Sequence, residues 1–199
     1  MIRRALDVVV AASVLALASP LLALAIVAIR IESRGGAIYR QRRVGQGGRE
    51  FDVLKLRTMV EGAERMGAGL AVDAGDARIT RVGAFLRRSS LDELPNLVNV
   101  LRGDMSLIGP RPTVPSQVAL YDQRQRGRLA IKPGITGWAQ VNGRASLPWS
   151  ERIELDLYYI DHRSPLLDAR IVARTLAALL HGGGLYRGER GGWDGPAPP

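Results

Sequence analysis

Two adjacent carboxylates, Asp92 and Glu93, stand in a part of the chain that is otherwise rich in arginine. Arg87 and Arg88 precede them and Arg111 follows, in a chain whose formal net charge is +9. A basic protein attracts anionic ligands such as phosphates, and a carboxylate can act as nucleophile, base or metal ligand. The pair is therefore a candidate site for chemistry on an anionic substrate.

The same pair also fits an ordinary structural role. Ser90 followed by Glu93 is a capping-box pattern, and acidic side chains in a first helical turn interact favourably with the helix dipole. Pro95 would fall at the fifth helical position, where it removes a backbone hydrogen bond and so weakens this interpretation. From these residues alone, a helix cap and a chemical site both remain open.

Length and composition indicate one main domain with an appendage in 199 residues. The absence of cysteine excludes a disulfide framework and a thiolate metal site. We expect a mostly helical α+β fold with small β-hairpin elements. We expect the chain to divide into a re-entrant membrane segment over residues 1–35, a cytoplasmic catalytic domain over residues 36–181 and a disordered tail over the glycine- and proline-rich residues 182–199.

Residues 8–29 form an uncharged run of 22 residues, which as a helix would reach about 33 Å and could cross a hydrocarbon core of about 30 Å. Ser19-Pro20 interrupts the run, because the proline removes the hydrogen bond to the carbonyl of Ala16, which the serine hydroxyl could satisfy instead. Arginines flank both ends, so the positive-inside rule places both in the cytoplasm. A re-entrant helix-break-helix would keep both arginine-rich flanks on the cytoplasmic side. A kinked spanning helix and a cleaved signal peptide are the alternatives.

A β-hairpin is predicted over residues 37–57, around a glycine-rich turn at residues 45–48. Strand alternation places Lys55 and Arg57 on the same face as the apolar side chains of the second strand. These two cations either belong to a site or lie on a solvated edge strand.

Arg111 lies between Pro110 and Pro112, which exclude a helix interior and favour stiff, extended backbone. It is either part of a rigid linker or a fixed fork for a phosphate or a carboxylate. An Asn142-Gly143 hairpin turn after a strand over residues 135–141 would leave Arg144 directly behind a tight turn.

The remaining pattern is mainly helical. Helices are predicted over residues 60–72, 81–86, 94–101, 149–160 and 165–181, with Ser164 as the N-cap of the last. The loop at residues 73–76 carries two aspartates that suit turn formation and could also ligate a hard cation. The last two helices are amphipathic, so each either covers the core or lies in the membrane interface.

Six motifs occur in order along the chain. They are YRQRRVG at residues 39–45, KLRTM at 55–59, DARITRVG at 76–83, SLDELPN at 90–96, RGDMSLIGPRP at 102–112 and KPGITGW at 132–138. Together they resemble those of the small monotopic phosphoglycosyl transferases, which are bacterial sugar transferases. The resemblance reaches from the N-terminus to about residue 181, and it matches the minimal form of that family.

The resemblance implies that a sugar 1-phosphate passes from a UDP-sugar to polyprenyl (undecaprenyl) phosphate at the cytoplasmic face of the bacterial inner membrane. UMP is released, and the lipid product starts a glycan, such as an exopolysaccharide or another glycoconjugate, that downstream glycosyltransferases extend. Asp92 would be the nucleophile of a covalent aspartyl-phosphosugar intermediate, Glu93 would support it, and Mg2+ would bind at Asp92.

Four cations match the basic positions of the family: Lys55, Arg87, Arg111 and Arg144. Ser19-Pro20 matches the break of its re-entrant membrane helix. No nucleic-acid partner is implied, and the motifs leave the identity of the sugar open.

Two other functions are compatible with the residues. One is a membrane-attached pyrophosphate hydrolase, in which Asp92 is a metal ligand and water attacks. The other is a non-catalytic anchor whose basic surface binds anionic lipids or nucleic acid.

Overall fold

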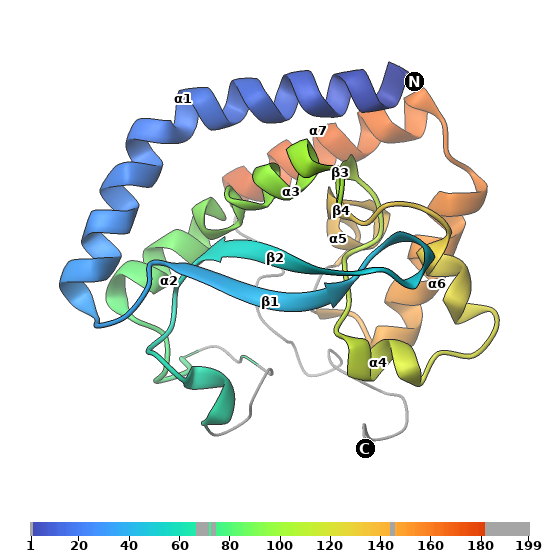
Figure 1. Ribbon diagram of the computed structural model, residues 1–199. Coiled ribbons are helices and arrows are strands. Elements are labelled where there is room, and N and C mark those ends of the chain that lie inside the picture. The colour runs from blue at the N-terminus through green and yellow to red at the C-terminus, as the bar shows by residue number, and fades with distance from the viewer. Residues whose placement is uncertain (1, 67–71, 73–74, 144–145, 182–199) are drawn as a thin grey trace.

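The computed structural model describes residues 2–66, 72, 75–143 and 146–181. The predicted tail and Arg144 lie outside these described residues. The fold is mostly helical with two small two-stranded sheets, which confirms the α+β prediction. One long helix arches over a body in which short helices surround the sheets (Figure 1).

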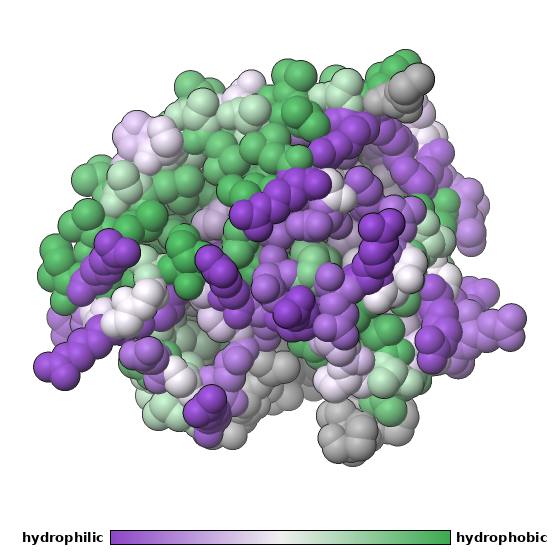
Figure 2. All heavy atoms as spheres, viewed as in Figure 1, coloured by the Kyte–Doolittle hydropathy of each residue, from purple (hydrophilic) through white to green (hydrophobic). Residues whose placement is uncertain are grey.

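The arch is α1, Ile2–Glu32, which contains Pro20 and is long and apolar enough to cross a membrane. Its ribbon bends along its length (Figure 1). The Ser19 hydroxyl donates to the carbonyl oxygen of Ala16 at 2.8 Å, so the predicted compensation for the proline is confirmed. Figure 2 shows apolar side chains over the arch of α1 and hydrophilic ones gathered over the body beneath it.

Both ends of α1 are fastened to the body by charged side chains. Near its start, Arg4 donates to two carbonyl oxygens, at 2.5 and 2.9 Å, in the last turn of α3, Asn96–Arg102. At its end, Glu32 accepts backbone N–H groups, at 2.7 and 3.0 Å, from the first two residues of α2, Arg81–Arg88. A cation at a helix C-terminus and an anion at a helix N-terminus both complement the helix dipole.

The predicted hairpin is confirmed. β1, Ile38–Val44, pairs antiparallel with β2, Glu50–Leu56, through the turn η1, Gln46–Gly48. Phe51 and Val53 of β2 are buried in one cluster with Leu97 and Val100 of α3. This burial fixes which face of the hairpin meets α3, and alternation places Lys55 on that same face.

The second sheet pairs β3, Ser106–Ile108, with β4, Gly134–Thr136, in parallel. The prediction of a strand to residue 141 followed by a hairpin turn is wrong, because the chain leaves β4 and enters α5, Trp138–Val141. The backbone of Gly137 approaches that of Gly109 so closely that a Cβ on Gly137 would lie 2.2 Å from the carbonyl oxygen of Gly109. This close approach between distant segments turns the chain inward, where two residues of α5 are buried.

The predicted helix over residues 60–72 is wrong in its described part, which holds only the 3-10 turn η2, Ala63–Arg65. Gly62 before it is left-handed, and Arg78 donates to the carbonyl oxygens of Ala63 and Met66, both at 2.8 Å. The Arg78 side chain therefore binds carbonyl oxygens at the end of this short turn, where a longer helix would use them for backbone hydrogen bonds. Arg78 also pairs with Asp76 at 2.6 Å, which fits the predicted turn role of that aspartate.

Short helices α4, Pro115–Ala119, and η4, Gln125–Ala130, lead to the two predicted C-terminal helices, α6, Trp149–Asp161, and α7, Pro165–His181. The Ser164 hydroxyl accepts the backbone N–H of Leu167 at 3.2 Å, which confirms the predicted N-cap of α7. α6 covers the core through Ile153 and Leu157. α7 buries Leu167 and Ile171 but leaves a second apolar row exposed: Leu166, Val172, Leu176 and Leu179.

Candidate active site

The carboxylate pair lies in a single 3-10 turn, η3, Leu91–Glu93, between α2 and α3. Ser90 before it adopts left-handed backbone, φ +56°, and its side chain makes no capping hydrogen bond. The helix-cap interpretation of the pair is therefore wrong. A left-handed residue other than glycine costs about 1–2 kcal/mol, and such strain tends to occur at functional sites.

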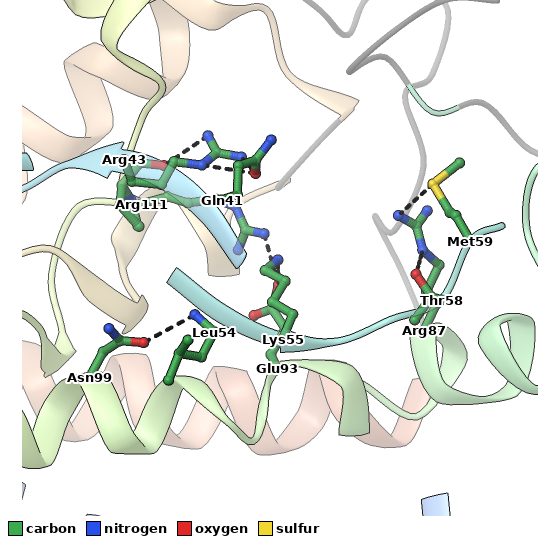
Figure 3. A network of polar contacts seen from close by, with 11 residues as sticks. Gln41, Arg43, Leu54, Lys55, Thr58, Met59, Arg87, Glu93, Asn99 and Arg111 are labelled. Atoms are coloured by element: carbon green, nitrogen blue, oxygen red, sulfur yellow. Dashed lines mark hydrogen bonds and ion pairs between the residues drawn. The ribbon is translucent and has the colours of Figure 1, made fainter. Parts of the chain in front are cut away.

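Glu93 joins two cations from distant segments (Figure 3). Its Oε1 atom accepts from Lys55 Nζ at 2.9 Å and from Arg111 NH2 at 2.8 Å. Burial acts to raise the pKa of Glu93, but Arg111 and Lys55 outweigh it and hold that pKa below its usual range. Glu93 is thus ionised and occupied by its partners. Lys55 is not a solvated edge residue, since only 20% of its side chain is exposed.

Asp92 is in the opposite situation. It is 9% exposed, and no hydrogen bond or ion pair joins its carboxylate to another described residue. Burial and the charge of Glu93 raise its pKa to about 6, against the opposing charges of Lys55, Arg87 and Arg111. Neighbouring carboxylates with separated pKa values are typical of a division of roles at a catalytic site. Asp92 is ionised at neutral pH, more basic than an ordinary aspartate, and unpaired.

Arg87 lies in the last turn of α2 and makes no hydrogen bond or ion pair with either carboxylate of the pair. Its Nε donates to the Thr58 hydroxyl at 2.9 Å, and its NH2 lies 3.9 Å from the Met59 sulfur (Figure 3). Gly83 allows α2 to pack closely against the Thr58 backbone. Any side chain there would clash, because a Cβ on Gly83 would lie 1.9 Å from the carbonyl oxygen of Thr58. The positive charge of Arg87 lowers the pKa of Asp92, so it acts on the pair through space.

Arg111 lies outside any helix or strand, in the segment after β3, and one nitrogen of its guanidinium donates to Glu93. Its main-chain carbonyl oxygen accepts from Arg128 NH2 at 3.0 Å. Arg128 is itself buried and paired with Asp156 of α6 at 2.6 Å. The segment that presents Arg111 to Glu93 is therefore anchored from behind.

A pocket opens on the Glu93 side of the pair. Its described lining includes the predicted residues Lys55, Glu93 and Arg111, together with Arg43 and Asn96, which the sequence analysis did not assign. Arg43 stands directly opposite Phe51 in the hairpin register, and opposed residues share a face of the sheet. That register was the available signal for Arg43. The structure thus brings Lys55, Arg87 and Arg111 close to Asp92 and Glu93. Ser19 and Pro20 lie apart from them in α1, and Arg144 stays a prediction.

The carboxylates fit the way proteins bind Mg2+ together with a phosphate substrate. The described residues contain no group of three His, Cys, Asp or Glu side chains that could enclose a metal by themselves. Mg2+ commonly takes one or two carboxylates and completes its coordination with phosphate oxygens and water. The unpaired Asp92 meets that need, since Glu93 is engaged by Lys55 and Arg111.

An unpaired carboxylate lies among fixed cations, in a body that also carries a long, largely exposed apolar helix. Such a combination is typical of an enzyme associated with a membrane. Comparison with known proteins gives the family. The family described as bacterial sugar transferase matches residues 1–182, so the chain belongs to it and is a transferase. The resemblance seen in the motifs is confirmed.

Three relatives indicate the range of the family. The UDP-glucose:undecaprenyl-phosphate glucose-1-phosphate transferase of Caulobacter vibrioides is 48% identical over 187 residues, which are 89% of this chain and 69% of that protein. The uncharacterized sugar transferase EpsL of Bacillus subtilis is 37% identical over 186 residues, 94% of this chain and 91% of that protein. The UDP-glucose:undecaprenyl-phosphate glucose-1-phosphate transferase of Escherichia coli is 42% identical over 184 residues, 88% of this chain but 39% of that protein.

Proposed function

We propose that this transferase moves a sugar 1-phosphate from a UDP-sugar to a polyprenyl phosphate such as undecaprenyl phosphate, through a covalent intermediate on Asp92. The names of the Caulobacter and Escherichia relatives support the overall reaction. The observation that carries the covalent step is the state of the two carboxylates. Asp92 is buried, basic and unpaired, whereas Glu93 is neutralised by two cations.

In the first step, a carboxylate oxygen of Asp92 attacks the phosphorus that bears the sugar. An oxygen–phosphorus bond forms, the bond to the second phosphate breaks, and the bonding electron pair leaves with UMP. In the second step, an oxygen of the polyprenyl phosphate attacks the same phosphorus. The aspartyl bond then breaks, Asp92 is regenerated, and a polyprenyl diphosphate sugar is released.

Attack by an anion on a diphosphate must overcome repulsion, and positioned cations stabilise the charge of the transferring phosphoryl group. Lys55 and Arg111 are fixed by Glu93 beside the nucleophile, and Arg87 is fixed by Thr58. Glu93 thus acts as the residue that holds two cations in place. Mg2+, held by Asp92 and phosphate oxygens, would supply further neutralisation of phosphate charge.

We further propose that α1 enters and leaves the cytoplasmic leaflet of the inner membrane. The contacts of Arg4 and Glu32 support this topology, because they hold both ends of α1 on one body. A straight spanning helix would separate its ends by a hydrocarbon core of about 30 Å. The exposed apolar row of α7 and Phe85 of α2, which is 61% exposed, are suited to lie in the same interface.

The decisive experiment is incubation of the purified protein with UDP-sugars and Mg2+, with and without polyprenyl phosphate. We expect one equivalent of UMP and a mass increase of one phosphosugar without lipid, and continuous UMP release with lipid. Asp92→Asn should abolish both and still associate with membranes. Continuous turnover without lipid would indicate the hydrolase, and unchanged activity of Asp92→Asn would disprove the nucleophile.

A further inference from the structure

The pocket on the Glu93 side of the pair carries more positive charge than its own carboxylate can neutralise. Three cations in its lining, Arg43, Lys55 and Arg111, face one carboxylate, Glu93, which gives the lining a net charge of +2. Of the two adjacent carboxylates, the described lining includes only Glu93. Lys55 and Arg111, which line the pocket, also act on the charge of Asp92, so a group bound here would lie close to that carboxylate.

Arg43 supplies one of the two unmatched charges, and the other remains because Lys55 and Arg111 share Glu93. The Arg43 Nε donates to the side-chain oxygen of Gln41 at 3.1 Å and its NH1 to the carbonyl oxygen of Pro112 at 3.3 Å (Figure 3). Both acceptors are neutral, and within the described chain no carboxylate forms an ion pair with Arg43. Burial and the neighbouring Arg111 lower the pKa of Arg43 to about 10, so it stays protonated at neutral pH.

The position of Arg43 is built rather than incidental. Gln41, which holds the guanidinium, is itself held by Glu64, because its Nε2 donates to Glu64 Oε1 at 3.0 Å. Two guanidinium groups, Arg43 and Arg111, are thus kept near one another against their mutual repulsion. Fixed like charges of this kind are typical of sites that bind an anion with several oxygens.

Asn96 gives an independent indication that the pocket takes a ligand. It is 3% exposed and lines the pocket, and its side-chain carbonyl oxygen is buried without a hydrogen-bond partner in the described structure. A buried amide normally forms hydrogen bonds, and leaving one unmade costs about 1–3 kcal/mol. The amide nitrogen of Asn96 is neither buried without a partner nor hydrogen-bonded within the described residues, so its N–H groups are available to an anion.

We infer that Arg43, with Asn96, forms a second phosphate subsite beside Asp92, which binds the dianionic phosphate monoester that is not under attack. The +2 charge of the lining balances the charge of about −2 on a phosphate monoester at neutral pH. Both the departing nucleoside monophosphate and the incoming lipid phosphate have this chemistry. The inference rests on the proposed function, since it identifies the phosphate groups through that reaction, but binding can be tested without turnover.

The test is calorimetric titration of UMP, uridine and a short-chain prenyl phosphate into the full-length protein in detergent. The variants are Arg43→Gln and the control Arg42→Gln. Arg42 neighbours Arg43 on β1 but lies on the other face, where it is exposed and faces Asp52 at 3.3 Å. Loss of a charge-assisted contact should weaken phosphate binding at least about tenfold in Arg43→Gln and less than about twofold in Arg42→Gln. Uridine, which has no phosphate, should bind both variants like the wild type.

The two phosphate ligands separate the sources of the anion. If Arg43→Gln weakens the binding of UMP alone, the subsite holds the leaving group. If it weakens the binding of the prenyl phosphate alone, the subsite holds the acceptor. Weaker binding of both ligands indicates one position that the two share. Equal affinities of wild type and Arg43→Gln for both ligands would overturn the subsite, as would an equal loss in Arg42→Gln. Arg43→Lys, which keeps a charge and should keep the wild-type unfolding midpoint, should give an intermediate loss. Failure of the proposed function would instead appear as absent UMP release from UDP-sugars by the wild-type protein.

Discussion

Arg128 donates to the main-chain carbonyl oxygen of Arg111 at 3.0 Å while its guanidinium pairs with Asp156 at 2.6 Å. Both members of that pair are almost fully buried. Arg128 also lies over the ring of Trp149, 5.0 Å from the ring centroid. The segment that carries Arg111 to Glu93 is thus tied to α6 through one buried cation.

Asp156→Asn should destabilise the protein by about 3 kcal/mol, because it leaves Arg128 buried without its counter-charge. Urea unfolding measures this change. The matched control on the same helix is Glu154→Gln, which removes the exposed Arg124–Glu154 pair and should leave the unfolding midpoint almost unchanged. Equal midpoints for the two variants would show that the buried pair does not anchor this segment.

Much of this arrangement follows from local patterns in the sequence. The hairpin is encoded by alternation around its glycines, and the stiffness around Arg111 is encoded by two prolines. The pair Asp92 and Glu93 is marked by its charge and by the surrounding motif. These features depend on residues close together in the chain, so they can be predicted without a structure.

The missed features depend on contacts between distant segments. The site position of Arg43 follows from the strand register, and the turn after β4 follows from the close approach of Gly137 to Gly109. The capping-box pattern at Ser90 predicts a helix start, but left-handed backbone there gives a 3-10 turn instead. No local propensity distinguishes these outcomes.

The pKa of Asp92 predicts the pH dependence of UMP release. Only the carboxylate form attacks phosphorus, and the pKa is raised to about 6 by burial and by Glu93. Single-turnover release should therefore rise about tenfold per pH unit below pH 6 and level off above it. A rate that is already constant from pH 5 would contradict this assignment.

Ionisation of Asp92 also lowers the free energy of unfolding, and the direction of this effect follows from the same pKa. Its folded pKa of about 6 lies above the ordinary value of 3.8, so the protonated form favours folding. That stability is fully present below pH 3.8 and is lost as the pH rises through 6. Asp92→Asn, which is always neutral, should be more stable than the wild type by up to about 3 kcal/mol at pH 8 and should show little difference near pH 4. Urea unfolding at both pH values checks this; an equal difference at both would disprove it.

Glu93→Gln should shift the pH profile of the first step towards acid. The charge of Glu93 helps to raise the pKa of Asp92, so its removal lowers that pKa. The same change frees Lys55 and Arg111 from their common partner, and loss of their fixed positions should slow transfer by at least about tenfold. The matched measurement is single-turnover UMP release from pH 5 to 8. A slower rate with an unshifted profile would show that Glu93 positions the cations without affecting the nucleophile.

Gly83→Ala should displace α2 and, with it, Arg87 in the last turn of that helix. An added Cβ would lie 1.9 Å from the Thr58 carbonyl oxygen, so the helix must move, and Arg87 would lose its bond to the Thr58 hydroxyl. We expect a destabilisation of about 1–3 kcal/mol and slower UMP release. Gly36→Ala is the control, since the nearest atom that its Cβ would meet is the carbonyl oxygen of Ile38, at 3.9 Å. Similar unfolding midpoints for both variants would contradict the role of this close packing.

The bend at Pro20 should determine on which side of the membrane the two ends of α1 lie. The chain contains no cysteine, so Ile2→Cys and Gly36→Cys each provide a single label site. In oriented vesicles, both should react with an impermeant thiol reagent from the same side, because Arg4 and Glu32 fasten both ends to one body.

Pro20→Ala restores the backbone N–H group that can donate to the Ala16 carbonyl oxygen, which now accepts from the Ser19 hydroxyl. The straighter helix should place the two labels on opposite sides in a fraction of the molecules. Opposite-side labelling with Pro20 intact would establish a spanning helix, and same-side labelling in both proteins would show that the end contacts fix the topology without the proline.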